Sequence, residues 1–281
     1  MTDAFAERSP GRETTSRTDF TSLLVDSVRL LRGRPTLALP FLVAGLVAAV
    51  GDALRLLDPV PATPQTAVQR GLGHVVLHAA PSVTSAVGTR VAALLGLRAG
   101  PLVSVVLTEG VPLAVTAVAA VVVIVRVTPG QTARTGRPIP RRALLARAAR
   151  LVGYELAVLA AFFVVATVAG SLGPLTLVVI VGLLFATVRL FVVPAAIARG
   201  SGIGAAVSTS VSSTRGHGWT LFGLVVVLGV AANLLVSLPV LLDSVVSVTG
   251  ESSLPVGTAL ATTCVGTVHA LLAGLAANRF A

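Results

Sequence analysis

Long apolar runs separated by short polar segments dominate this sequence. A helix needs about 20 mostly apolar residues to cross a bilayer. The runs that reach this length are Thr36–Leu54, Leu102–Val125, Leu156–Val188, Trp219–Leu242 and Leu254–Ala277. The third is too long for one span, and we divide it at Gly170–Pro174 because glycine and proline break helices. Backbone groups in lipid must bond within their own segment, so the pattern predicts six transmembrane helices arranged as three hairpins.

The polar segments before and between these apolar runs suggest the domain organisation. Residues 1–19 are polar and are expected to form a disordered tail, and residues 20–281 a single membrane domain. The long segment 55–98 is expected to be a loop on the outer side. The predicted fold class is therefore an all-α polytopic membrane helix bundle.

Three ungapped segments resemble one another, starting at Ser22, Arg142 and Ala205, and each precedes a predicted span. Their glycines Gly33, Gly153 and Gly216 coincide. The apolar positions also share one helical phase, which is typical of an amphipathic helix lying in the membrane interface. We expect each repeat unit (20–125, 140–196 and 203–277) to consist of an interfacial helix, a glycine turn and a hairpin.

The charged residues suggest an orientation for these spans. Only 11% of the residues are charged, against roughly 25% in soluble domains, and all 21 basic residues are arginine. If both termini are cytoplasmic, 17 arginines lie on that side and four on the other, as the positive-inside rule requires. Topology then accounts for the net charge of +10, and no nucleic-acid partner is expected. The expected partner is a cell membrane with anionic headgroups, contacted by Arg29, Arg142, Arg147, Arg150 and Arg215.

The segment Arg189–Leu224, RLFVVPAAIARGSGIGAAVSTSVSSTRGHGWTLFGL, resembles a recurring pattern of span exit, short loop, amphipathic helix and next span. The pattern is similar to the membrane domain attached to some bacterial glycerophosphodiester phosphodiesterases and to related stand-alone archaeal and bacterial membrane proteins. The composition is similar to haloarchaeal members. This chain departs from the phosphodiesterases by having no soluble catalytic domain, so the resemblance implies a membrane fold without that activity.

Two polar residues within predicted spans are candidates for function. Glu109 lies in the second span, where a carboxylate costs roughly 2.5–3.5 kcal/mol at the bilayer centre. It is either functional or an acid near the outer end that contacts water. No basic partner for Glu109 is evident within a span. The nearest candidate is Arg189, but it should lie near the opposite, cytoplasmic end of its span. His269, in the sixth span, is either a proton-relay group or a residue that hydrogen-bonds across helices.

No enzyme signature accompanies these residues. The sequence contains no Walker loop, no H-E-x-x-H and no G-x-S-x-G motif. His74 and His78 are spaced for a metal, but no third ligand is apparent nearby, so no metal site or cofactor is expected. An ion pair with Arg147 or Arg150 is the expected role of Glu155. The sequence favours a non-enzymatic membrane protein that organises membrane or binds partners. The alternative is a transporter of a small apolar or lipid-like solute.

The predicted orientation can be tested by cysteine labelling. Cys264 is replaced first, and Thr135→Cys then places a thiol in the arginine-rich segment between the second and third spans. We expect an impermeant thiol reagent to label it only after the cells are broken open. Labelling in intact cells would reverse the orientation.

Overall fold

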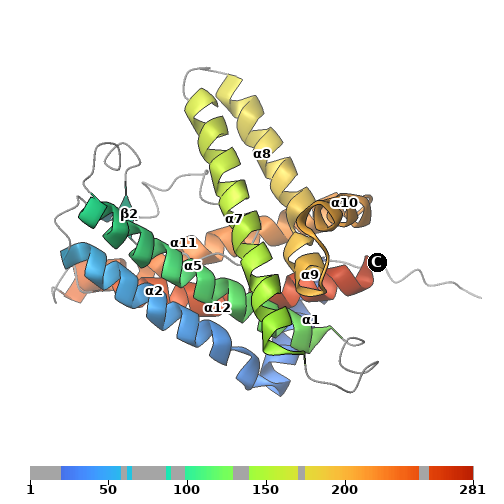
Figure 1. The fold of residues 1–281 in the computed structure, drawn as a ribbon, viewed down its shortest axis with the longest axis horizontal. Coiled ribbons are helices and arrows are strands. Elements are labelled where there is room, and N and C mark those ends of the chain that lie inside the picture. Colours follow the sequence, from blue (N-terminus) through green and yellow to red (C-terminus); the bar gives the residue numbers. More distant parts are fainter. Residues whose placement is uncertain are drawn as a thin grey trace, which may run out of the picture.

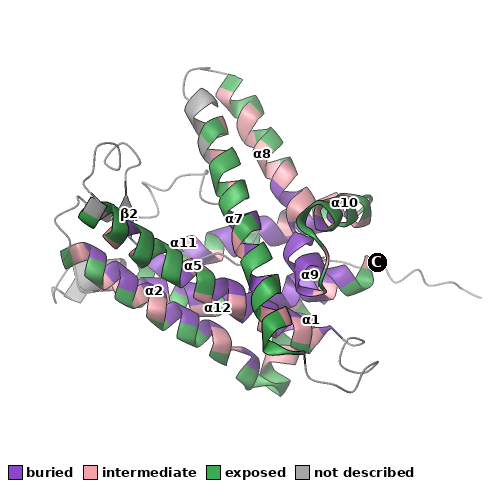
Figure 2. Ribbon diagram, viewed as in Figure 1, coloured by how far each residue is buried: buried purple, intermediate pink, exposed green. Residues whose placement is uncertain are grey.

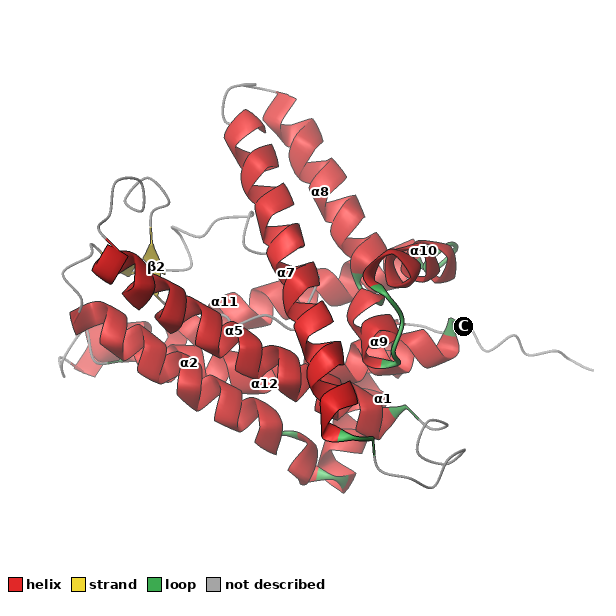
Figure 3. Ribbon diagram, viewed as in Figure 1, coloured by secondary structure: helices red, strands yellow, loops and turns green. Residues whose placement is uncertain are grey.

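The computed structural model describes residues 20–57, 62–64, 87–89, 99–128, 139–169, 175–246 and 253–280. Apart from two short antiparallel strands, its regular elements are helices, which confirms the all-α class (Figures 1 and 3). The elements are α1 (Phe20–Gly33), η1 (Pro35–Leu37), α2 (Leu39–Leu57), β1 (Ala62–Pro64), β2 (Val87–Thr89), α5 (Ala99–Val127), α7 (Arg141–Ala169), α8 (Thr176–Leu190), α9 (Val193–Ala198), α10 (Ile203–Ser213), α11 (Gly218–Val246) and α12 (Leu254–Arg279).

Helix α12 lies at the centre of the bundle. It packs against α2, α5, α11, α1 and α9, and it is more buried than any other candidate span (Figure 2). Helix α2 approaches α12 closely because each of the two helices has a glycine at the contact. A Cβ at Gly45 of α2 would lie 2.7 Å from the backbone oxygen of Ala259, and one at Gly266 would lie 2.6 Å from the ring of Phe41. Small residues at helix crossings are the usual means of close packing in membranes.

Helices α7 and α8 lie side by side and extend away from the α2–α5–α11–α12 bundle at a steep angle (Figure 1). The short helix α9 joins them to the bundle, since all six of its residues are buried and it packs against α5, α7, α10 and α12. Phe191 and Val192 separate α8 from α9, and Pro194 begins the new helix. Proline is favoured in a first helical turn because its missing N–H would have no partner there.

Within the described ranges, five helical segments are long and apolar enough to cross a membrane. They are Pro35–Leu57, Gly100–Val127, Thr176–Ala198, Gly218–Pro239 and Leu254–Arg279. These match five of the six predicted spans. The third predicted span corresponds to the second half of α7, several of whose side chains lie outside the described residues. The count of six therefore stays a prediction, as does the turn at Gly170–Pro174, which also lies outside them.

The predicted glycine turns occur in two copies of the repeat. Gly33 ends α1, and Gly216, with a φ of +84° that glycine adopts readily, lies in the turn between α10 and α11. The prediction is wrong for Gly153, which lies inside the continuous helix α7. In the first copy Pro35 follows two residues after the glycine, whereas Tyr154 and Glu155 follow Gly153 and can continue a helix.

The shared apolar stripe of these segments packs against the protein. Leu23 and Ser27 of α1 are buried, and α1 contacts α11 and α12. Ala206 and Ser210 occupy the same stripe in α10 and are buried beside α8 and α9. The expectation that this face points into lipid is therefore wrong for these positions. Its periodicity is the same whether lipid or another helix covers the face.

The close approach of α2 and α12 predicts a selective effect of one added methyl group. Gly45→Ala places a Cβ against the backbone of Ala259, which cannot rotate away, and should lower the free energy of unfolding by about 1–3 kcal/mol. The control is Gly110→Ala in α5, where nothing lies within 4 Å. Denaturation in mixed micelles measures both. Equal stability of the two variants would contradict the packing.

Candidate functional site

A buried arginine joins α2 to α5 near the end of the bundle away from the chain termini. Nη1 of Arg55, in the last turn of α2, donates to Oε1 of Glu109 in α5 at 2.7 Å. The Arg55 residue is only 1% exposed, while half of the Glu109 side chain is accessible. A buried guanidinium needs a counter-charge because the interior replaces little of its hydration. Glu109 supplies that charge.

A second acid lies one turn earlier on α2. Asp52 is 5% exposed, and its Oδ2 accepts a hydrogen bond from the hydroxyl of Thr258 in the first turns of α12. Asp52, Arg55, Glu109 and Thr258, here called the Arg55 cluster, thus tie α2, α5 and α12 together at one end. The cluster combines two acids with one arginine, and the partly accessible edge of Glu109 is its exposed part.

The structure corrects the sequence interpretation of this region. Glu109 does have a basic partner, and Arg55, assigned to the outer loop, is a buried helical residue. Arg189 instead donates to the carbonyl of Val211 and the hydroxyl of Thr214, at 3.4 and 3.3 Å. The sequence prediction did not include Asp52 among the candidate site residues. Opposite charges at positions i and i+3, as in Asp52 and Arg55, were the available signal that this helix end is polar on one face.

His269 belongs to a different part of the bundle. It is fully buried, and its ring stacks almost parallel on Phe191 with centroids 4.9 Å apart. Thr258 and His269 are 11 residues apart on α12, which corresponds to about 16 Å of helix rise. Glu109 and His269 are therefore not part of one site. The ring of His269 joins α12 to the junction of α8 and α9.

A network of arginines joins the helices at the opposite end, where the described chain begins and ends. In α7, Arg147 and Arg150 donate to the carbonyls of Ala198 and Gly200, just after α9. Arg199 donates to the carbonyl of Ala277 and the side chain of Asn278 at the end of α12. Arg279, at the end of α12, completes the network by bonding to two side chains of α1.

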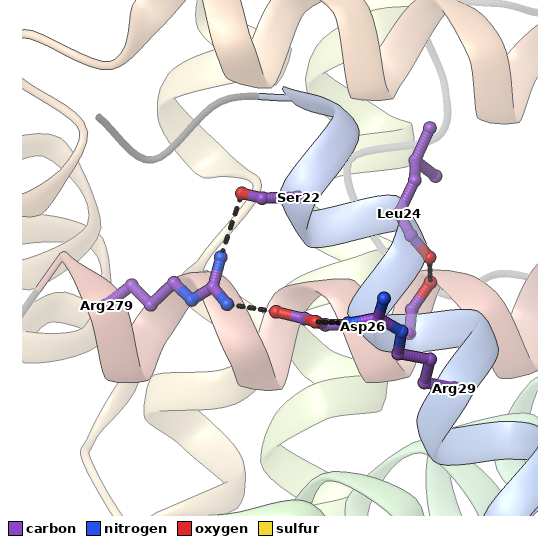
Figure 4. A network of polar contacts seen from close by, with 6 residues as sticks. Ser22, Leu24, Asp26, Arg29 and Arg279 are labelled. Atoms are coloured by element: carbon purple, nitrogen blue, oxygen red, sulfur yellow. Dashed lines mark hydrogen bonds and ion pairs between the residues drawn. The ribbon is translucent and has the colours of Figure 1, made fainter. Parts of the chain in front are cut away.

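Figure 4 shows this last link. The guanidinium of Arg279 donates to Ser22 Oγ at 3.1 Å and pairs with the carboxylate of Asp26. Arg29 lies on the other side of the same carboxylate, with its Nη1 3.9 Å from Asp26 Oδ1. The first and last described helices therefore meet, which puts both ends of the described chain on one side of the bundle.

The five arginines predicted to contact headgroups differ in their surroundings. Arg29, Arg142, Arg150 and Arg215 are exposed, as a headgroup contact would require. Arg147 is half-buried, and its guanidinium lies 2.8 Å from the carbonyl of Ala198. We therefore assign Arg147 to helix packing, because its hydrogen bond is directed into the protein.

Glu155 also differs from its predicted role. It is 3% exposed, and both of its carboxylate oxygens lack a hydrogen-bond partner among the described residues. The expected partners, Arg147 and Arg150, bind backbone carbonyls instead. Among the described residues no three His, Cys, Asp or Glu side chains are grouped to hold a metal. His74 and His78 lie outside those residues.

Comparison with known proteins adds no relative: no family model, curated protein or solved structure matches the chain significantly. The class of protein therefore rests on the fold itself. An all-α bundle with five helices, counted in the described part of the chain, that are long and apolar enough to cross a bilayer is a multi-pass membrane protein. The resemblance to phosphodiesterase membrane domains stays a prediction.

The ion pair reverses the expected effect of replacing Glu109. Without a basic partner, Glu109→Gln would be neutral or slightly stabilising. Because the replacement removes the counter-charge of buried Arg55, we now expect it to lower the free energy of unfolding by about 1–2 kcal/mol, allowing for the half-exposed Glu109. Unfolding in mixed micelles measures the change, with Glu251→Gln as the control of equal charge. A Glu109 variant as stable as that control would refute the prediction.

Proposed function

We propose that this chain is a non-enzymatic integral membrane protein that organises the surrounding membrane by holding anionic lipid headgroups at the end that carries its termini. The supporting observation is that the arginines of the described residues, apart from Arg29, which lies against Asp26, fall into two groups. The first group bonds to the protein: Arg55, Arg147, Arg150, Arg189, Arg199 and Arg279. The second group is exposed, and none of its guanidinium groups has a hydrogen bond or ion pair to a described residue: Arg32, Arg34, Arg126, Arg141, Arg142 and Arg215.

Most of the second group lies at one end of the bundle. Arg55 near the end of α2 pairs with Glu109 in the first half of α5, so these two helices are antiparallel. The start of α2, with Arg32 and Arg34 just before it, therefore lies toward the end of α5, where Arg126 is. Helix α7 packs against α5, and its first half, which begins with Arg141 and Arg142, lies against the bundle while its end extends away with α8 (Figure 1). An arginine near an anionic surface contributes about 1 kcal/mol, so such a group favours anionic lipid.

Trp219 supports the same placement in the membrane. It is almost fully exposed at the start of α11, three residues after Gly216 and beside Phe222. Tryptophan is enriched at the level of the headgroups because its ring is apolar and its N–H is polar. Arg215 lies four residues earlier, in the turn that precedes α11, so an anchor and a cation occur close together in sequence at this helix start.

Lipid retention tests this proposal. The triple variant Arg34→Gln, Arg141→Gln and Arg142→Gln removes three exposed charges from the proposed face. We expect phosphatidylglycerol retained from mixed phosphatidylglycerol and phosphatidylcholine vesicles to fall by about tenfold or more, because each arginine contributes about 1 kcal/mol. Mass spectrometry after detergent exchange measures the retained lipid.

The matched control removes three arginines from the segment between α2 and α5: Arg70→Gln, Arg90→Gln and Arg98→Gln. It should retain phosphatidylglycerol as the unmodified protein does. An equal loss in both triple variants would show that net charge, and not this face, holds the lipid, and the proposal would fail.

A transporter of a small apolar or lipid-like solute is the second candidate. One observation favours it, since the Arg55 cluster brings three ionisable side chains from two helices together. Carriers, however, place several inward polar groups at the midplane, and this cluster lies toward one end of α2. Saturable flux of a lipid-like probe into proteoliposomes, lost in Glu109→Gln, would favour the carrier over the proposed organiser.

A further inference from the structure

Glu155 is a buried acid to which the proposed lipid-holding function assigns no role. It lies on the face of α7 that carries the buried residues Ala148 and Leu151. The residue is 3% exposed, and neither carboxylate oxygen has a hydrogen-bond partner among the described residues. Helix α7 packs against α5, α8, α9 and α10, so its possible partners are on those elements.

No basic residue of these elements neutralises Glu155. On α7 itself, Arg147 and Arg150 donate to backbone carbonyls beyond α9. Arg189 of α8 is bonded to α10 and the turn that follows it. Arg126 of α5 is exposed at the helix end, as are Arg141 and Arg142 at the start of α7. The described parts of α9 and α10 contain no ionisable side chain.

The remaining titratable neighbours do not stabilise an ionised Glu155 carboxylate either. The adjacent Tyr154 is buried, and its hydroxyl lies 3.5 Å from the carbonyl of Leu190. Glu109, the acid of α5, is paired with Arg55 of α2. A charge at Glu155 would thus be buried without hydrogen bond or counter-ion, which costs several kcal/mol.

A bound proton removes this cost, and a metal ion does not. Sodium and similar cations need several oxygen ligands, as calcium and magnesium do, whereas among the described residues no three His, Cys, Asp or Glu side chains are grouped to hold a metal ion. A proton needs only the carboxyl group itself. A neutral acid in an apolar contact costs less than an ion, which is the usual outcome for an unpaired buried carboxyl group.

We propose that Glu155 is a proton-binding site of the folded protein, occupied at neutral pH and emptied when α7 separates from its neighbours. An exposed glutamate has a pKa of about 4.3, so the unfolded chain releases this proton above that value. The folded state then binds one proton more than the unfolded state. Stability must therefore fall as the pH rises, with a tenfold larger unfolding constant per pH unit.

A comparison of pH slopes tests the site. Unfolding constants in mixed micelles are measured between about pH 5.5 and 8 for the unmodified protein and for Glu155→Gln, which resembles the neutral acid in shape. The ratio of unmodified to variant constants should rise about tenfold per pH unit. Val158→Ala on the same helix serves as the control, and its ratio should lack that rise because it loosens α7 without removing a titratable group. A flat ratio for Glu155→Gln would overturn the proposal.

Infrared spectroscopy tests the proton directly and does not require the variant to fold. The five glutamates are labelled with carbon-13 at the side-chain carboxyl. At pH 7 the folded, unmodified protein should show the C=O stretch of a protonated acid, shifted by the label, and unfolding should abolish it. Glu109→Gln should retain this band. Absence of the band from the folded protein would refute the site, while leaving the lipid-holding function untouched.

Discussion

The structure depends on one constraint: a polar group removed from water must find a partner inside the protein. The apolar runs satisfy it for the backbone by forming helices. For side chains the solutions are particular to each site. Arg55 pairs with an acid from another helix, while Arg147 and Arg199 bind carbonyls near helix ends, where backbone acceptors are left over. The same bonds that satisfy these charges also hold the helices in register.

The two ends of the bundle satisfy this constraint differently. At the Arg55 cluster, opposite charges from α2 and α5 neutralise one another near Thr258 of α12. At the terminal end, arginines outnumber acids, and apart from Arg279 and Arg29, which lie against Asp26, the bonded ones use neutral acceptors, so most of the positive charge is not cancelled. Between the ends, close approach at Gly45 and Gly266 gains dispersion energy, and the hydroxyl of Thr263 in α12 donates to the carbonyl of Phe41 in α2 at 3.3 Å. The bundle is therefore fixed by charge at its ends and by shape at its centre.

The sequence predicts much of this fold, because hydropathy alone identifies helices that must satisfy their own backbones. It fails where the answer depends on a distant neighbour. Arg55 reads as a loop arginine because its partner Glu109 is 54 residues away. Gly153 reads as a turn because it aligns with Gly33, yet no proline follows it to end the helix. The stripe that contains Leu23 has the periodicity of a lipid-facing helix, and only the position of α12 shows that protein covers it. Candidate sites were thus harder to predict than helices.

Glu109 and Glu155 show how the same side chain can lead to different chemistry. The carboxylate of Glu109 bonds directly to a fully buried arginine of another helix. Glu109 is therefore suited to hold α5 against α2. Glu155 has no such partner among the described residues, so of these none stabilises its charge. If the protein responds to protons at all, the response belongs on α7, the helix that leaves the central bundle, and its effect would be to change how that helix packs on α5 and α9.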